Sequence, residues 1–345
     1  MNSVIIETCQ SCWHYIIFKE ANSNIKMNEI NLKAYAKINL GLDICGRRSD
    51  GYHELYTLMQ SVDIADCITI RRLDSKRYEQ SKDIKESIHI VSDSLDIPSD
   101  AGNIAYKAAA MIINEAQSFY SGFNADDINI EIEIKKNIPV QAGMGGGSAD
   151  AAAVLAGMNK LLELDIDEIK LKDYALRLGA DVPYCLTGGT ALCSGIGEVI
   201  EKIPNFPKCG FVIVKPDKGM STKEIFEEFD KTTSKDILRP DINKLRNAVI
   251  SGDLYAASKQ ALNVLEAAVI KRLPEIAAIK RALYKAGALS ASMTGSGSAV
   301  FGIFKDIQTA LICAESLKDK RSFNINTEII PTKSIGKGWE VYRHG

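Results

Sequence analysis

Hydrophobic and polar residues alternate strictly over residues 128–134, where every second residue is isoleucine. A period of two places successive side chains on opposite faces of a strand, so this segment is predicted to be a half-buried β-strand. Residues 148–162 are rich in alanine and contain one glycine and no proline, which is typical of a well-formed helix. A glycine-rich loop lies between the two segments. The order strand, loop, helix is therefore predicted for residues 128–162.

The rest of the chain shows a mixed pattern of strands and helices. Looser alternation, interrupted by turn residues at 46–51, predicts an early β region over residues 32–70. Mixed strands with segregated helices favour an α+β class over a doubly wound α/β sheet. Further predicted helices are 103–116, 166–178, 221–229, 241–249, 274–286 and 307–317, and further predicted strands are 190–194, 211–214, 299–304 and 327–330.

The length of 345 residues favours two packed domains. The alternating pattern begins only after Met27, so residues 1–26 are treated as an N-terminal extension. The glycine pair at 188 and 189 predicts a turn into a new strand, and we place the domain boundary there. The expected units are 27–188 and 189–345.

Composition and charge narrow the class of partner. The chain is 46% hydrophobic and 25% charged with a formal net charge of −2, and no run approaches the roughly 20 apolar residues needed to cross a bilayer. Nucleic acids and anionic membranes bind basic surfaces, so neither is an expected partner. We expect small-molecule partners and a cytoplasmic location, because the first 26 residues lack the features of a signal or transit peptide. The sequence predicts no oligomeric state.

Eight cysteines are scattered through apolar segments, which is typical of reduced core thiols and not of a disulfide framework. Cys9 and Cys12, with His14 nearby, have the spacing of half a metal or redox motif. No second Cys/His pair at ligand spacing follows, so chance occurrence is favoured over a zinc or dithiol site.

The loop before the Ala-rich helix has the chemistry of a phosphate site. Its glycines lack the Cβ atoms that would hold a bulky anion away, so backbone N–H groups can converge on phosphate oxygens. The helix adds its unpaired N-terminal amides and the positive end of its dipole, and Ser148 can cap the helix or contact phosphate or metal. The predicted phosphate-binding residues are Pro139, Val140, Gln141, Ala142, Gly143, Met144, Gly145, Gly146, Gly147, Ser148 and Ala149.

Other interpretations of this loop fit less well. No Lys-Ser or Lys-Thr pair closes it, so it is not the P-loop of ATPases. A dinucleotide fingerprint needs a βαβ context and an acidic residue at a second strand end, and the loop lies too far into the chain to open such a domain. A linker or a tight packing turn stays open as an alternative, although a linker is not usually followed at once by an Ala-rich helix.

Three other regions carry recognisable segments. They read AKINL with RRSDGYH at 36–40 and 47–53, LGADVP at 178–183, and MTGSGSAVF at 293–301. With the loop and in this order, they resemble the GHMP kinase superfamily, and within it the branch that phosphorylates a cytidine diphosphate derivative of methylerythritol in the non-mevalonate isoprenoid pathway. The resemblance extends over most of residues 30–330. It departs from the usual pattern at Met144, where Leu is usual, and at Ala149, where a second hydroxyl is usual.

The resemblance implies a two-domain α+β fold with ATP and the acceptor bound in the cleft between the lobes. It also implies transfer of the γ-phosphoryl group of ATP to the 2-hydroxyl of the acceptor, with Mg²⁺ bound to the nucleotide. No carboxylate cluster in the sequence identifies the protein ligands of this metal, so they stay open. Gly295 and Gly297 would form a second tight loop beside the phosphate loop, and on their own they predict a β-turn.

Through the resemblance, five residues outside the loop receive roles. Asp181 would be the base that takes the proton of the acceptor hydroxyl, and Lys37 would pair with Asp181 and with the γ-phosphate. Asn39 lies two residues after Lys37, on the same face of the strand, and would orient the hydroxyls of the acceptor. Tyr52 would stack on the cytosine ring, and His53 would hydrogen-bond to its edge.

Simpler explanations stay open for these residues and for the function. Asp181 can be a turn or helix-end residue, Lys37 a solvent-facing lysine and His53 a partly buried turn histidine. The alternative functions are a GHMP kinase for another alcohol, such as mevalonate or homoserine, and a catalytically silent nucleotide-binding regulator on the same fold.

Overall fold

The computed structural model describes residues 27–73, 87–232, 237–319 and 327–343. The extension at 1–26, with the Cys9 and Cys12 motif, lies outside the described residues. Within the described ranges, no helix combines the length and the apolar character needed to cross a membrane. The six cysteines in these ranges are free thiols, and the expected core position holds for four of them, Cys185, Cys193, Cys209 and Cys313, whereas Cys67 is half-buried and Cys45 exposed.

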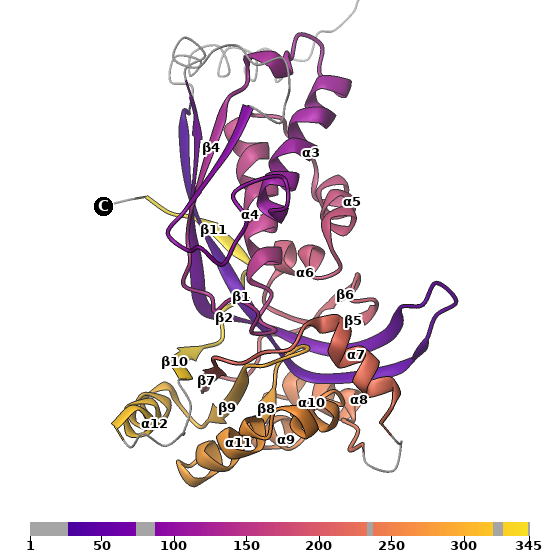
Figure 1. The fold of residues 1–345 in the computed structure, drawn as a ribbon, viewed down its shortest axis with the longest axis vertical. Coiled ribbons are helices and arrows are strands. Elements are labelled where there is room, and N and C mark those ends of the chain that lie inside the picture. Colours follow the sequence, from indigo (N-terminus) through magenta and orange to yellow (C-terminus); the bar gives the residue numbers. More distant parts are fainter. Residues whose placement is uncertain (1–26, 74–86, 233–236, 320–326, 344–345) are drawn as a thin grey trace, which may run out of the picture.

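A long antiparallel hairpin runs through both halves of the molecule (Figure 1). Its strands are β1 (Glu29–Arg47) and β2 (His53–Arg72), joined at residues 48–52. The pairing shifts register at three places along the hairpin, including one between Asn39 and Gly41. Register shifts of this kind increase the local twist and bend of a strand, so one hairpin can serve two packed layers.

The upper half in Figure 1 contains a seven-stranded sheet. The strand order is β11-β1-β2-β4-β3, and β5 pairs with both β2 and β6. All pairs are antiparallel except β3 with β4. The added strands are β3 (Ile88–Ser92), β4 (Ile130–Lys135), β5 (Thr190–Gly195), β6 (Val199–Lys202) and β11 (Trp339–Val341).

Helix α4 (Gly146–Leu161) packs directly on this sheet (Figure 1), and most of its residues are buried. A Cβ atom at Gly157 would lie 2.7 Å from Ile70 Cδ1 and 2.8 Å from Leu32 Cδ1, so glycine permits the close approach of helix and sheet. Its alanines serve the same end, because small side chains let the backbone approach. The neighbouring helical elements are α3 (Ile104–Phe119), η1 (Ala125–Asp127), α5 (Glu168–Leu178) and α6 (Val182–Thr187).

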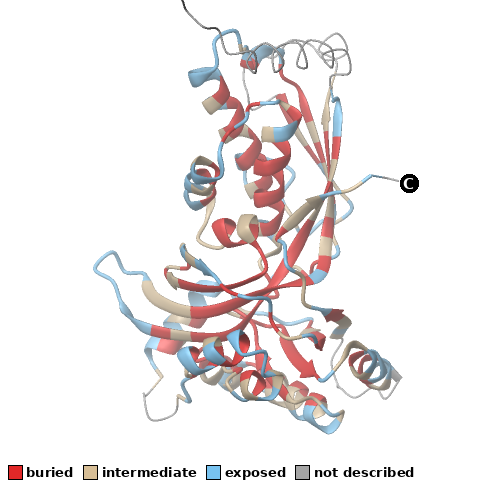
Figure 2. Ribbon diagram, turned by 180° about the vertical axis from the view of Figure 1, so that it is seen from behind, coloured by how far each residue is buried: buried red, intermediate tan, exposed pale blue. Residues whose placement is uncertain are grey.

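The lower half contains a four-stranded antiparallel sheet in the order β10-β7-β9-β8. Leu42 and Ile44 of the hairpin belong to its apolar core, so β1 is anchored in both halves. Figure 2 shows the buried residues of both cores as red strands and inward helix faces. The elements are β7 (Gly210–Pro216), α7 (Thr222–Asp230), α8 (Ile242–Ile250), α9 (Leu254–Lys259), α10 (Glu266–Arg272), α11 (Glu275–Lys285), β8 (Ser290–Met293), β9 (Val300–Phe304), α12 (Ile307–Asp319) and β10 (Thr327–Lys333).

The α+β class is confirmed, and every helix and strand named from the sequence is present with small shifts at its ends. Several short elements had no predicted range, namely β3, η1, α6, β6, α9, α10, β8 and β11. Strands β5 and β6 follow residue 189 and still belong to the first sheet, and β11 returns to it from the C-terminal end. The first sheet therefore contains strands from both sides of residues 188 and 189. The domain boundary that we placed there stays a prediction.

Candidate active site

The glycine-rich loop turns sharply into α4. Gly143 and Gly145 have φ angles of +73° and +71°, in the left-handed region that favours glycine. Helix α4 begins at Gly146, with Gly145 at its N-cap and no side chain capping it. The suggestion that Ser148 caps the helix is therefore wrong, because Ser148 lies within the first turn. The uncapped backbone N–H groups of this turn are free to bind an anion.

A second glycine loop packs against the first. Thr294 Oγ1 donates to the carbonyl oxygen of Gly143 at 3.3 Å, and Ala299 N donates to that of Ala142 at 3.2 Å. A Cβ atom on Gly143 would lie 2.3 Å from Thr294 O and 2.9 Å from Gly297 N. Glycine at 143 is thus required by both its φ angle and its neighbours. The second loop does lie beside the first, as the resemblance implied.

Lys37 and Asp181 form an ion pair next to the glycine loop. Lys37 Nζ lies 3.4 Å from Asp181 Oδ2, and the two side chains are 5% and 33% exposed. Asp181 stands at the N-cap of α6 but accepts no capping hydrogen bond. Asp181 is thus a helix-end residue, as one simpler explanation proposed. Its carboxylate does not cap the helix, however, and is paired with Lys37 instead. The solvent-facing explanation of Lys37 is wrong, because its side chain is buried.

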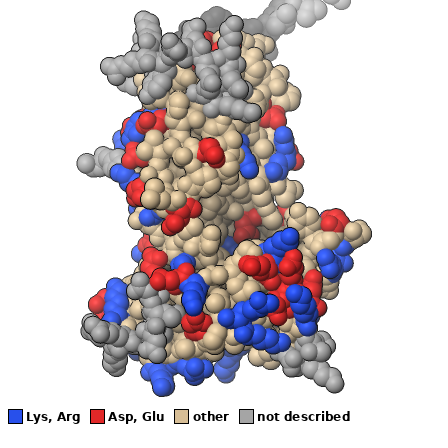
Figure 3. All heavy atoms as spheres, in the orientation of Figure 1, with Lys and Arg blue, Asp and Glu red and all other residues tan. Residues whose placement is uncertain are grey.

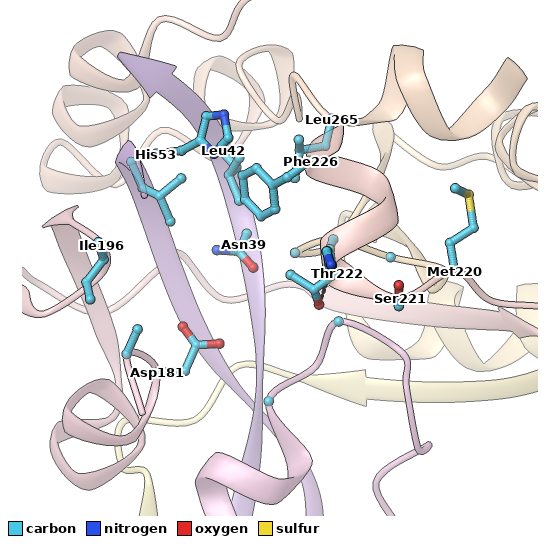
Figure 4. Close-up of a pocket in the computed structure, with 18 of the residues that line it drawn as sticks. Asn39, Leu42, His53, Asp181, Ile196, Met220, Ser221, Thr222, Phe226 and Leu265 are labelled. Carbon is cyan, nitrogen blue, oxygen red and sulfur yellow. Dashed lines mark hydrogen bonds between the residues drawn. The ribbon is translucent and has the colours of Figure 1, made fainter. Parts of the chain in front are cut away.

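Asn39 lies on the same face of β1 and is almost completely buried. Its Oδ1 accepts from Lys37 Nζ at 2.8 Å, and its Nδ2 donates to Thr57 Oγ1 at 2.9 Å. Its backbone N–H donates to Thr294 Oγ1 at 3.0 Å. In this structure Asn39 therefore orients the lysine and links it to the second glycine loop. Figure 4 shows the side chains of Asn39 and Asp181 facing the same space.

His53 lies at the far end of the hairpin and contacts α7. Its ring stacks on Phe226 with centroids 4.7 Å apart, and its Nε2 is 2.8 Å from Asp230 Oδ1 (Figure 4 labels His53 and Phe226). Arg47 Nη1 lies 3.4 Å from the other oxygen of Asp230. Tyr52 is 62% exposed beside this cluster. Phe226 and Asp230 were not found from the sequence, although the helix that carries them was.

A cavity of about 940 Å³ joins these groups. It extends from the Lys37 and Asp181 pair and the glycine loop to His53, Tyr52 and α7, so residues from both halves line it. Figure 3 shows a hollow between the two halves, with acidic and basic side chains gathered on the region of α7 beside it. The expected cleft between the lobes has its counterpart in this cavity.

A second cavity of about 380 Å³ lies on the other side of the glycine loop. It is lined by the loop itself, by residues 97–98 and 102–104 before and at the start of α3, and by Lys136 and Asp150. Gln141, Gly143, Gly145 and Ser148 line both cavities, so the loop is the wall that the two share. The sequence had predicted the helix that starts at 103–104, but nothing had marked residues 97–104 as part of a binding site.

Among the described residues, no group of three or more His, Cys, Asp or Glu side chains is arranged to hold a metal ion. Mg²⁺ that arrives with a nucleotide takes most of its ligands from phosphate oxygens and water, so one or two protein oxygens suffice. Ser148 and the Asp181 carboxylate are oxygen donors that line the larger cavity. The residues present are therefore compatible with a nucleotide-borne magnesium ion.

Comparison of the chain with family models and with curated proteins shows the family to which it belongs. The model of the GHMP kinases N terminal domain matches residues 103–189, and the model of the GHMP kinases C terminal domain matches residues 241–321. The chain is 42% identical to 4-diphosphocytidyl-2-C-methyl-D-erythritol kinase of Clostridium botulinum (strain Eklund 17B / Type B), over 84% of this chain and 96% of that protein. The chain belongs to this family of GHMP kinases.

Further relatives agree with that assignment. The protein of the same name from Clostridioides difficile (strain 630) is 42% identical, over 91% of this chain and 98% of its own length. A crystal structure of 4-(cytidine 5'-diphospho)-2C-methyl-D-erythritol kinase has a TM-score of 0.70 and 27% identity, covering 89% of this chain and 100% of that chain. A homoserine kinase from Cytophaga hutchinsonii reaches the same TM-score at 21% identity, over 91% and 98% of the chains. At that identity the likeness concerns the fold alone.

Substituting Gly143 tests whether the contact between the two glycine loops is required. Gly143→Ala should lower the free energy of unfolding by about 2 kcal/mol or more, since it adds strain at positive φ and a clash with backbone. Gly147→Ala is the matched control, because its Cβ atom would meet nothing nearer than Ile104 Cγ2 at 3.5 Å. Urea unfolding of the three proteins gives the comparison. Equal stability of the Gly143 variant and the parent would contradict the required close contact.

Proposed function

We propose that this chain transfers the γ-phosphoryl group of ATP to the 2-hydroxyl of 4-diphosphocytidyl-2-C-methyl-D-erythritol, forming the 2-phosphate and ADP. The reaction is a step of the non-mevalonate pathway of isoprenoid biosynthesis. The observation that carries the proposal is one cavity with the Lys37 and Asp181 pair at one end and His53 and Tyr52 at the other. Relatives that are 42% identical over 84–91% of the chain bear the name of this kinase.

The two cavities suggest how donor and acceptor meet. A phosphoryl transfer requires two separate molecules whose reacting atoms come into line. We propose that the triphosphate crosses the glycine loop from the smaller cavity, which takes the nucleoside, and that the acceptor fills the larger one. The loop residues from Pro139 to Ala149 would bind the phosphates through the backbone N–H groups at the start of α4. Ser148 would add a hydroxyl, and the alanine at 149 does not weaken a cradle made of backbone.

Lys37 and Asp181 would carry the chemistry. The Asp181 carboxylate would accept the proton of the acceptor hydroxyl as the oxygen attacks phosphorus. The ammonium of Lys37, buried and held by Asn39, would neutralise charge on the transferred group and keep the carboxylate aimed at the hydroxyl. Magnesium bound with the nucleotide would supply further positive charge to the phosphate oxygens.

At the other end of the cavity, Tyr52 and His53 would recognise the cytosine. A proton on His53 Nε2 bonded to Asp230 leaves Nδ1 as an acceptor, and an acceptor suits the exocyclic amine of cytosine. Tyr52 offers an exposed ring for stacking. Asn39 would act by orienting Lys37, because its side-chain amide is already hydrogen-bonded to Lys37 and Thr57. The expected contact of Asn39 with the hydroxyls of the acceptor stays a prediction.

The proposal includes a cytoplasmic setting and small-molecule partners only. ATP is the donor, and the described cysteines are free thiols, as in reducing compartments. Neither nucleic acid nor a membrane is required by the reaction.

Purified protein given ATP, Mg²⁺ and 4-diphosphocytidyl-2-C-methyl-D-erythritol should form ADP and the 2-phosphate, followed by coupled ADP detection and ³¹P NMR. CDP and CMP should inhibit in competition with the acceptor, because the cytosine contacts are shared. Turnover of mevalonate or homoserine without inhibition by CDP would favour a GHMP kinase of another alcohol. ATP binding without turnover of any alcohol would favour a regulator.

Asp181→Asn removes the proposed base with little change of shape. We expect kcat to fall by about 10²–10⁴-fold, the usual contribution of a general base, with little change in ATP affinity. Asp173→Asn, an exposed position on α5, is the control and should leave kcat unchanged. An Asp181 variant that loses ATP affinity at unchanged kcat would contradict the assigned role.

Asp230→Asn tests the control of His53 by α7. With an amide in place of the carboxylate, the proton on His53 Nε2 is less strongly fixed, so the KM for the cytidine substrate should rise about three- to thirtyfold while the KM for ATP stays unchanged. Glu228→Gln is matched, since it lies on the same helix and also loses an ion pair, that with Arg272. Steady-state kinetics with each substrate varied separates the two KM values. A rise in both would point to general damage to α7.

A further inference from the structure

A buried lysine lies between two carboxylates beneath the glycine loop. Lys136 Nζ contacts Asp66 Oδ2 and lies 2.8 Å from Asp150 Oδ2. The three side chains are only 7%, 0% and 4% exposed. Buried ions are costly unless they are paired and hydrogen-bonded, so a triad at this depth has to be held in place by its own contacts. Neither the sequence motifs nor the proposed chemistry uses these residues.

The triad joins three segments that meet at the phosphate site. Asp66 lies on β2, Lys136 follows β4 at the entrance to the loop, and Asp150 lies on α4. Asp66 Oδ1 also accepts the backbone N–H groups of Asn137 at 2.6 Å and Ile138 at 2.8 Å. Asp66 therefore links the entry of the loop to the sheet. Lys136 links α4 to Asp66 by way of Asp150.

The ammonium lies directly under the first residue of α4. A Cβ atom on Gly146 would be 3.4 Å from Lys136 Nζ and 3.2 Å from Ile138 Cγ2. Gly146 is the first helical residue, and its N–H belongs to the group of free amides that face the loop. Because Lys136 also binds Asp150 on the same helix, a displacement of Lys136 is expected to shift the start of α4.

We propose that Lys136 is a positioning residue for nucleotide binding, which together with Asp66 and Asp150 holds the glycine loop and the start of α4 in their phosphate-binding arrangement. This inference rests on the proposed nucleotide site, but not on the identity of the acceptor. Lys136 also lines the smaller cavity together with Asp150, so its neighbours lie where the donor would bind.

The net charge of the triad depends on whether Asp66 and Asp150 are both ionised. Two ionised carboxylates and one ammonium would leave a negative charge under the phosphates. Both oxygens of Asp66 are bonded, whereas Asp150 Oδ1 is buried and has no hydrogen-bond partner among the described residues. An ionised oxygen buried without a donor is costly, so we place the proton of the neutral triad on Asp150.

The surroundings of Asp150 favour that neutral form. Burial and the nearby charge of Asp66 raise the pKa of Asp150 well above its usual range, against the opposing effect of Lys136. For Lys136, burial alone would lower the pKa, but Asp150 and Asp66 outweigh it and raise the pKa, so the ammonium persists. The thiol of Cys185 on α6 also faces Asp150, and burial raises its pKa so that it stays neutral. On the other side of Lys136, Asp66 is held by the ammonium and by the backbone N–H groups of Asn137 and Ile138.

Exchanging each carboxylate for its amide separates the two roles. Asp66→Asn should raise the Kd for MgATP about ten- to a hundredfold, the scale of a small displacement of a binding group, because it removes the balancing charge. Asp150→Asn should raise the Kd for MgATP less than Asp66→Asn does, because it replaces a neutral acid with a neutral amide whose oxygen can still accept from Lys136. Lys136→Met should behave like the Asp66 variant, and Lys135→Met, at an exposed neighbouring lysine, should behave like the parent.

The measurement is calorimetric binding of MgATP without acceptor, combined with KM values for both substrates and urea unfolding. The proposal expects the KM for ATP to rise while the KM for the cytidine substrate stays within about twofold, which general loss of stability would not produce. Equal effects of the two Asn variants, or unchanged ATP affinity of a folded Lys136 variant, would overturn it. If Lys136→Met does not fold, the two Asn variants alone decide. MgATP binding needs no acceptor, so failure here is distinguishable from a wrong acceptor in the proposed function.

The pH dependence provides a second readout. Loss of the proton on Asp150 would place a negative charge beneath the phosphates, so the affinity of the parent for MgATP should fall as pH rises through the raised pKa of Asp150. Asn at 150 cannot titrate, so the ratio of the two affinities should change with pH in that direction. A ratio that changes with pH in the opposite direction would contradict the assigned proton.

Discussion

The buried ammonium of Lys37 is the charge around which the site is arranged. A lysine that is 5% exposed has lost most of its water and needs anions or oxygen acceptors in exchange. Asn39 and Asp181 supply two of them, whereas the ammonium has three N–H donors, so Lys37 retains capacity for a further acceptor. An incoming phosphoryl group can complete the coordination. The glycine loop is joined to β1 at the same place, because Lys37 N donates to Met144 O at 3.0 Å.

The second buried lysine, Lys136, also needs partners in place of the water that it has lost. Two carboxylates surround it, and one of them also binds two backbone N–H groups. Both carboxyl groups hold Lys136 in place, so the interaction contributes to the shape of the loop. The site thus combines an ammonium that lines the larger cavity with one that is buried beneath the loop. A single glycine-rich segment lies between them and is held from both sides.

Much of this could be predicted because the decisive signals are local. Strict alternation over the strand before the loop and alanine-rich spacing after it specify β4 and α4, and the glycines specify a backbone that no other residue adopts easily. The pairing of Lys37 with Asp181 came from the family resemblance, and the geometry agrees. The sequence could not show Phe226 and Asp230 beside His53, since a contact across more than 170 positions leaves no periodicity. The sequence likewise offered no reason to single out Asp66, because its partners lie about 70 positions away in the chain.

The contact between the hairpin end and α7 explains why recognition and chemistry can differ among proteins of one fold. Lys37, Asn39 and the loop belong to the part of β1 and α4 that is packed in the first core, where substitutions would disturb the fold. His53 and Tyr52 lie at the opposite end of the same hairpin, against a helix of the second half, where the surface is partly open. We therefore expect a change of acceptor to involve mainly the side chains at that end and on α7. The phosphate cradle, fixed by the glycine loops and the triad beneath them, can remain the same.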